Sequence, residues 1–143
     1  GTLSILVNPE HPLFSNFPTE NHSDWQWWSI IHNSRPMILN NTPAGYKPLI
    51  QVVDNVERNY KLGLLFEFAV NKGKLLVCMS NLANIQNTPE GVQFQNALIR
   101  YMNSTTFAPA DHITWNELKA LFTSDVKQKK IIEVKNITDY TKF

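Results

Sequence analysis

The stretch LGLLFEFAVNKGKLLVCMS, which spans Leu62–Ser80, decides the fold. It consists of two apolar runs, Leu62–Val70 and Lys74–Ser80, on either side of the short turn 71–73, which contains a glycine. Two apolar runs joined by such a turn predict a β-hairpin. Runs that are apolar almost without interruption are typical of strands in a sheet that is covered on both faces. We therefore expect this hairpin to belong to a sheet with helices on its faces.

Further strands and helices are predicted on both sides of the hairpin. Apolar, β-branched runs predict strands, and capping signals predict helices that begin after Ser23, Thr88 and Thr114. Strands alternating with helices indicate an α/β fold with a mixed, largely parallel sheet flanked by helices. The expected strands, besides the hairpin, are Leu3–Asn8, Met37–Asn41, Leu49–Asp54 and Ile131–Val134, and the expected helices are 24–33, 89–103 and 115–122.

Length and composition limit the class of protein. A chain of 143 residues has the size of one domain, and we expect residues 1–143 to form a single α/β domain. Hydrophobic residues make up 43% of the chain, which argues against disorder, and no apolar run approaches the ~20 residues of a membrane span. The formal net charge of +1 argues against non-specific nucleic-acid binding and against a polybasic membrane anchor. We therefore expect neither nucleic acid nor a membrane as a partner.

Cofactor and metal chemistry lacks a signature in this sequence. The glycines are isolated, so no phosphate-binding loop is predicted. Cys78 is the only cysteine, which excludes a Cys-rich zinc site, and the four histidines are scattered without metal-ligand spacing. We expect no cofactor and no metal site.

The run Trp25-Gln26-Trp27-Trp28 is the most informative local feature. On a helix Trp25 and Trp28 share one face, and three indoles in four residues exceed what one core layer holds. Two interpretations remain open. An exposed indole face stacks on a sugar ring or marks an interface, or the tryptophans fix the proline-rich loop 11–20 onto the sheet.

Two other features are candidates for chemistry. The polar loop Asp54–Lys61 follows a predicted strand, where functional sites are common, but it also fits a solvated loop in which Arg58 pairs with an acid. Cys78 lies inside an apolar strand, where nothing nearby stabilises a thiolate, so inert packing is favoured. A small hydrolase or amidotransferase-like enzyme that uses Cys78 or Asp54 stays an alternative.

An ordered series of motifs extends over most of the chain. The motifs are HPLF (11–14), FPTE (17–20), HSDWQWW (22–28), RP (35–36), QVVDN (51–55), RN (58–59), KLGLLFE (61–67) and GKLLVC (73–78). This series resembles the C-terminal accessory region of large bacterial glycoside hydrolases of family 2, the β-galactosidase-like type of Bacteroidetes-type bacteria. The resemblance covers about residues 3–109, which leaves residues 110–143 as a C-terminal extension, expected to hold a short helix and a strand.

The resemblance implies a glutamine-amidotransferase-like (flavodoxin-like) fold, or part of one, without catalytic duty. The parent enzyme's catalytic glutamates lie in a separate barrel domain, so no catalytic residue is assigned here. The implied role is a scaffold or a glycan-binding domain, periplasmic or extracellular, whose partners are the other domains of the parent hydrolase and a glycan. The candidate carbohydrate-binding residues are Trp25 or Trp28 for stacking, with His22, Asp24, Asp54, Arg58 and Asn59 for hydrogen bonds to hydroxyl groups.

The same resemblance raises a question about the sheet edge. In such domains a strand–helix half would precede Leu3. Without that half the sheet would expose an edge, and exposed edges pair between chains. A homodimer is therefore expected as a further partner state, and an oligomerisation module is the third class of function.

Overall fold

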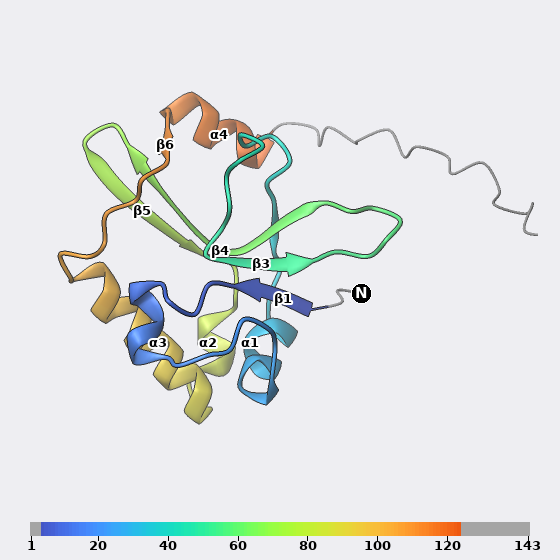
Figure 1. The fold of residues 1–143 in the computed structure, drawn as a ribbon, viewed down its shortest axis with the longest axis vertical. Helices are drawn as coiled ribbons and strands as arrows, with labels where there is room; N and C mark the ends of the chain where they lie inside the picture. The colour runs from blue at the N-terminus through green and yellow to red at the C-terminus, as the bar shows by residue number, and fades with distance from the viewer. Residues whose placement is uncertain (1–3, 124–143) are drawn as a thin grey trace, which may run out of the picture.

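The structure, a computed structural model, describes residues 4–123. Its strands form one mixed sheet of six strands (Figure 1). The expected strand Ile131–Val134 lies outside the described residues. The strands are β1 (Ser4–Val7), β2 (Met37–Ile38), β3 (Ile50–Val53), β4 (Lys61–Val70), β5 (Gly73–Cys78) and β6 (His112–Ile113).

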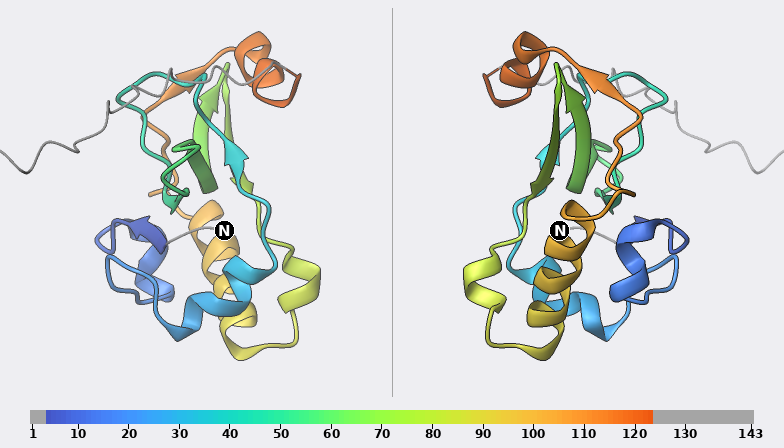
Figure 2. Two further views of the ribbon diagram at one scale, coloured as in Figure 1. Left: turned by 90° about the vertical axis from the view of Figure 1, so that its right-hand side faces the viewer. Right: turned by 90° about the vertical axis from the view of Figure 1, so that its left-hand side faces the viewer.

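The helices gather at two ends of the molecule. Figure 2 shows α1, α2 and α3 together at one end and α4 at the other, next to β6. The helices are the 3-10 turns η1 (Pro12–Asn16) and η2 (Trp25–Trp27), then α1 (Trp28–His32), α2 (Leu82–Ile85), α3 (Pro89–Met102) and α4 (Trp115–Thr123).

The central strand of the sheet is β4. It pairs in antiparallel fashion with β2, β3 and β5, and β1 pairs in the same way with β3. Among the described strands, the β4–β6 pair alone is parallel. The predicted hairpin is confirmed, with Val70 paired to Gly73 across a turn in which Asn71 has φ 52°. The outer side of β1 carries no strand among the residues the structure describes.

The expectation of a largely parallel, flavodoxin-like sheet is therefore wrong. The alternation of strands with helices and the near-continuous apolar runs favour such a sheet, and the flavodoxin-like, glutamine-amidotransferase-like form of it is what the resemblance implies. In the structure β4 is apolar because strands flank it on both sides and side chains cover both of its faces. A central antiparallel strand has the same burial, so the pattern does not decide strand direction.

A β-bulge in β4 sorts its apolar side chains between two cores. Consecutive residues of β3 pair with Gly63 and Leu65, so Leu64 is an extra residue. An extra residue reverses the face to which the following side chains point. Accordingly Leu62 packs into one apolar cluster and Phe66 into the other.

The larger cluster lies between the sheet and the helical end. It includes residues of η1, η2, α1, α2 and α3, whereas the smaller cluster joins β4 to α4 and to Tyr46 of the β2–β3 loop. The helix α3 is held close to α2 because Gly91 has no side chain: a Cβ there would lie 1.9 Å from the carbonyl oxygen of Ile85. Thr88 caps α3 as predicted, with its Oγ1 accepting from the Gly91 N–H at 3.1 Å.

Candidate functional site

Trp27 anchors the segment that carries the exposed tryptophans. Its side chain is fully buried, and its Nε1 donates to the Thr19 Oγ1 at 2.8 Å. The indole packs edge-on against Phe17 and Phe94, with ring centroids 5.2 and 5.9 Å away. Trp27 therefore fixes the proline-rich loop to α3, whereas the packing interpretation placed that loop on the sheet.

Trp25, Trp28 and His32 form a continuous exposed surface, which we call the aromatic platform. Trp25 is 86% exposed and Trp28 63% exposed, and their ring centroids lie 6.2 Å apart at a tilt of 58°. The His32 ring stacks on Trp28 at 5.7 Å and 16°. Two of the three indoles therefore point into solvent, while the third holds their backbone in place.

The local sequence explains this geometry. The Asp24 carboxylate accepts from the Gln26 N–H at 3.0 Å and begins the 3-10 turn η2, so Asp24, rather than the predicted Ser23, is the N-cap. Ser23 instead forms a hydrogen bond with Ser4, in which the two Oγ atoms lie 3.0 Å apart. Side chains three residues apart on a 3-10 turn point to the same side, so Trp25 and Trp28 share one side of the turn. With Trp27 directed inward, that shared side faces solvent.

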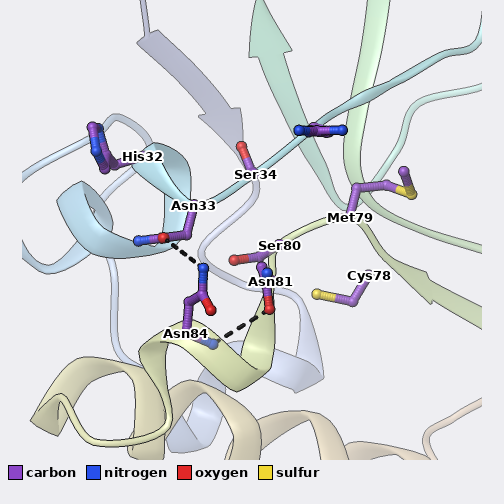
Figure 3. A pocket seen from close by; sticks show the side chains of 9 residues that line it. His32, Asn33, Ser34, Cys78, Met79, Ser80, Asn81 and Asn84 are labelled. Atoms are coloured by element: carbon purple, nitrogen blue, oxygen red, sulfur yellow. Dashed lines mark hydrogen bonds between the residues drawn. The ribbon is translucent and has the colours of Figure 1, made fainter.

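A pocket of about 630 Å³ adjoins the platform through His32. It lies between the end of α1, the segment that follows β5, and α2, and Figure 3 shows polar side chains facing it from all of these elements. We call it the amide pocket. It is lined by His32, Asn33, Ser34, Arg35, Cys78, Met79, Ser80, Asn81 and Asn84.

Hydrogen bonds fix the orientation of the three asparagines in the pocket. The Asn33 Nδ2 donates to the carbonyl oxygen of Ser29 at 2.9 Å, so its Oδ1 is the atom that accepts from the Asn84 Nδ2 at 3.4 Å. The Asn81 Oδ1 accepts from the Asn84 backbone N–H at 3.3 Å. No protein partner is assigned, among the described residues, to the Asn81 Nδ2 or the Asn84 Oδ1. The pocket thus presents one amide donor and one amide acceptor (Figure 3).

A family profile described as "Domain of unknown function (DUF8487)" matches residues 1–123. The chain belongs to the DUF8487 family. The match includes every element that the structure describes, from β1 to α4. No curated protein matches this DUF8487 domain.

The predicted site residues of the DUF8487 domain fall into two groups. Trp25 and Trp28 form the platform, and His22 and Asp24 are exposed on the same segment without lining the pocket. The His22 Nδ1 lies 3.0 Å from the Asn21 Oδ1, and Asp24 is used as the helix cap.

The second predicted group lies in the β3–β4 loop and consists of Asp54, Arg58 and Asn59. Asn59 is exposed and has φ 48°, which places it in the left-handed conformation. Among the described contacts none joins this loop directly to the platform. The link is indirect: Ser4 pairs with Val53 in the sheet and lies next to Ser23.

Asp54 closes the β3–β4 loop on itself. Its buried carboxylate accepts from the Arg58 Nη2 at 2.5 Å and from the Tyr60 N–H at 3.1 Å. Burial raises the pKa of the carboxyl, but the hydrogen bonds from Tyr60, Asn55 and Arg58 outweigh it and hold the pKa of Asp54 below its usual range. A carboxylate engaged in this way has a structural role, as the loop interpretation predicted.

Cys78 lines the amide pocket but lacks the features of a nucleophile. Burial raises the pKa of its thiol, a shift that the backbone hydrogen bond from Ser80 offsets only in part. The thiol is therefore protonated near neutral pH, and no described contact joins it to His32, the imidazole that lines the same pocket. This arrangement does not favour the alternative of an enzyme that uses Cys78.

Sequence reasoning missed the amide pocket. Its key side chains Asn33, Arg35, Asn81 and Asn84 come from segments far apart in the chain. The one available signal was Asn81, a residue type that favours the N-cap of a helix and caps α2 here. The helix that follows has four residues, too few to show a helical periodicity in the sequence.

Within residues 4–123, no group of three or more His, Cys, Asp or Glu side chains is placed to hold a metal ion. No described helix has the length and apolar character needed to cross a membrane.

Proposed function

We propose that this DUF8487 domain is a non-catalytic, glycan-binding accessory domain of a carbohydrate-degrading enzyme of the family 2 glycoside hydrolase type. The observation that carries the proposal is the aromatic platform, which leads through His32 into the amide pocket. The motif series that resembles the accessory region of those hydrolases supports the second half of the proposal.

The platform and the pocket match the two kinds of surface that a sugar presents. The C–H face of a pyranose ring is apolar and stacks on an exposed indole, while its hydroxyl groups donate and accept hydrogen bonds. Trp25 offers the most open indole face, because His32 already covers part of Trp28. The amide donor of Asn81 and the amide acceptor of Asn84 supply both kinds of hydrogen bond in the adjoining pocket.

Trp27 already fills the core position, and Trp25 and Trp28 leave most of their apolar area in water. Contiguous exposed aromatic area commonly marks a binding surface. As an accessory domain in the periplasm or outside the cell, the protein would hold its parent hydrolase on a polysaccharide and raise the effective substrate concentration at the catalytic domain.

Calorimetric titration with a panel of oligosaccharides tests the proposal. The panel contains matched pairs: galactose, glucose and mannose oligomers, each beside the uronic-acid oligomer of the same ring configuration, and xylan oligomers with and without glucuronic acid branches. We expect at least one glycan to bind, and Trp25→Ala to weaken it by about tenfold, which corresponds to ~1.4 kcal/mol.

Trp115→Ala is the matched control. Trp115 is 64% exposed on α4, at the opposite end of the molecule, so its removal should leave binding unchanged. Absence of heat from every glycan would overturn the proposal, and so would an equal loss of affinity in the two variants.

A further inference from the structure

The amide pocket contains an arginine without a protein partner. The backbone N–H of Arg35 donates to the Met79 carbonyl oxygen at 3.0 Å, which fixes the residue at the pocket wall. Its side chain is exposed, and no hydrogen bond or ion pair involves its guanidinium within the described part of the chain. By contrast, Arg58 is paired with Asp54.

The charge of the pocket wall has one sign. None of the described residues that line the pocket is an aspartate or a glutamate, whereas Arg35 is cationic. The free amide donor of Asn81 adds to this donor character. A pocket with an unpaired guanidinium and no acid attracts an anionic group.

We propose that the amide pocket binds the carboxylate of a uronic acid unit in the glycan, with Arg35 as the residue that selects it. The inference rests on the proposed function, because it names the class of sugar that the same site takes. A guanidinium presents its donors in a planar fork that matches the two oxygens of a carboxylate, and such charge-assisted pairs are among the stronger hydrogen bonds.

The platform and the pocket then divide the work of recognition. Stacking on Trp25 is indifferent to the charge of the sugar, so it holds neutral and acidic units alike. The acidic unit gains the Arg35 pair in the pocket, whereas a neutral hexose leaves those donors to water. The selectivity therefore arises from an added attraction for the uronic acid.

The matched pairs of the oligosaccharide panel test this directly. We expect the uronic-acid member of at least one pair to bind about tenfold or more tightly than its neutral counterpart, a difference of ~1.4 kcal/mol. Equal affinity for both members of every binding pair would overturn the carboxylate inference and leave the glycan-binding proposal standing. Absence of binding by every member would overturn both.

Variants of Arg35 locate the effect. Arg35→Gln should abolish the preference for the acidic member, and Arg35→Lys should keep part of it, because lysine retains the charge but loses the fork. Lys72→Gln removes one positive charge in the β4–β5 turn, outside the pocket, and serves as the control for net charge. An equal loss of preference in Lys72→Gln would show that only overall charge matters and would contradict the proposal.

The salt dependence of binding gives a second test of the ion pair between Arg35 and the sugar carboxylate. Raising the salt from about 0.1 M to about 1 M shortens the screening length from about 10 Å to about 3 Å. The preference for the acidic member should shrink over this range in the wild-type protein and stay absent in Arg35→Gln. Thermal unfolding of each variant checks that Arg35→Gln folds, since an exposed side chain without partners should leave the melting temperature nearly unchanged.

Discussion

The segment 22–32 and the loop 54–60 both contain residues that the sequence singles out as candidates for binding, but the two regions differ in how many of these side chains already have partners within the protein. In the loop, the Asp54 carboxylate binds Arg58 and the Tyr60 N–H, and the Asn55 Oδ1 accepts from the Arg58 N–H at 2.9 Å. In the segment 22–32, the rings of Trp25 and Trp28 face solvent beside a pocket with unused amide groups. The Asp54 carboxylate and the Asn55 Oδ1 already have partners within the loop, whereas the platform and the pocket beside it leave groups open to a ligand.

This difference shows how a binding surface is separated from a structural one. A dense set of polar residues is no evidence of a site when the set satisfies itself. The useful quantity is the number of donors, acceptors and aromatic faces that remain after all internal contacts are counted. The same reasoning separates Trp27 from its neighbours within one short segment.

The largest expected effect is that of Trp27→Ala. Removing a fully buried indole that contacts Phe14, Phe17 and Phe94 leaves a cavity, and such truncations cost about 3–5 kcal/mol of unfolding free energy. Urea unfolding monitored by circular dichroism measures the loss. A change below about 1 kcal/mol would contradict the role of Trp27 as the anchor of the platform.

Asp54→Asn should give the next largest effect. The substitution keeps the shape but removes the charge that Arg58 and the Tyr60 N–H share, and hydrogen bonds to a charged group contribute about 1.5–3 kcal/mol. Glycan affinity should stay unchanged, because the loop does not line the pocket. Loss of glycan binding without loss of stability would reverse the comparison between the two regions.

The Asp54 effect should also depend on pH. The folded-state pKa of Asp54 is lowered, so its contribution is present above the unfolded-state value of about 3.9 and is lost as the pH falls through the folded value. The stability difference between the wild type and Asp54→Asn is therefore largest near neutral pH and shrinks below about pH 4. Urea unfolding at a series of pH values measures it, and a difference that grows in acid would contradict the assignment.

Local signals predicted much of the secondary structure but not how the strands pair. The turn at Asn71, the cap at Thr88 and the capping box of Thr114 and Glu117 are encoded within a few residues, and all three are present. Strand direction depends on pairings between distant segments, such as Ser4 with Val53, which no local pattern reveals. The short elements α2 and β6 were missed because two to four residues carry no periodicity.

Only part of the candidate site could be predicted, because the rest of it also depends on contacts between distant segments. Helical spacing correctly placed Trp25 and Trp28 together, but the contact of Trp27 with Phe94 of α3 decides which indole is buried. The choice of Ser23 as the cap failed because the neighbouring Asp24 has an equally suitable side chain. The pocket depends on the fold as a whole, since it brings the end of α1 next to the chain that leaves β5.

The smallest expected effect on stability is that of the platform itself. Trp25→Ala removes a side chain that is 86% exposed and has lost little contact with water on folding, so the unfolding free energy should change by no more than about 0.5 kcal/mol. The same variant is the one expected to weaken glycan binding, which separates function from stability within one substitution. Urea unfolding run beside the titrations measures both quantities. A destabilisation comparable to that of Trp27→Ala would mean that Trp25 supports the fold, and the contrast between an open platform and a closed loop would then fail.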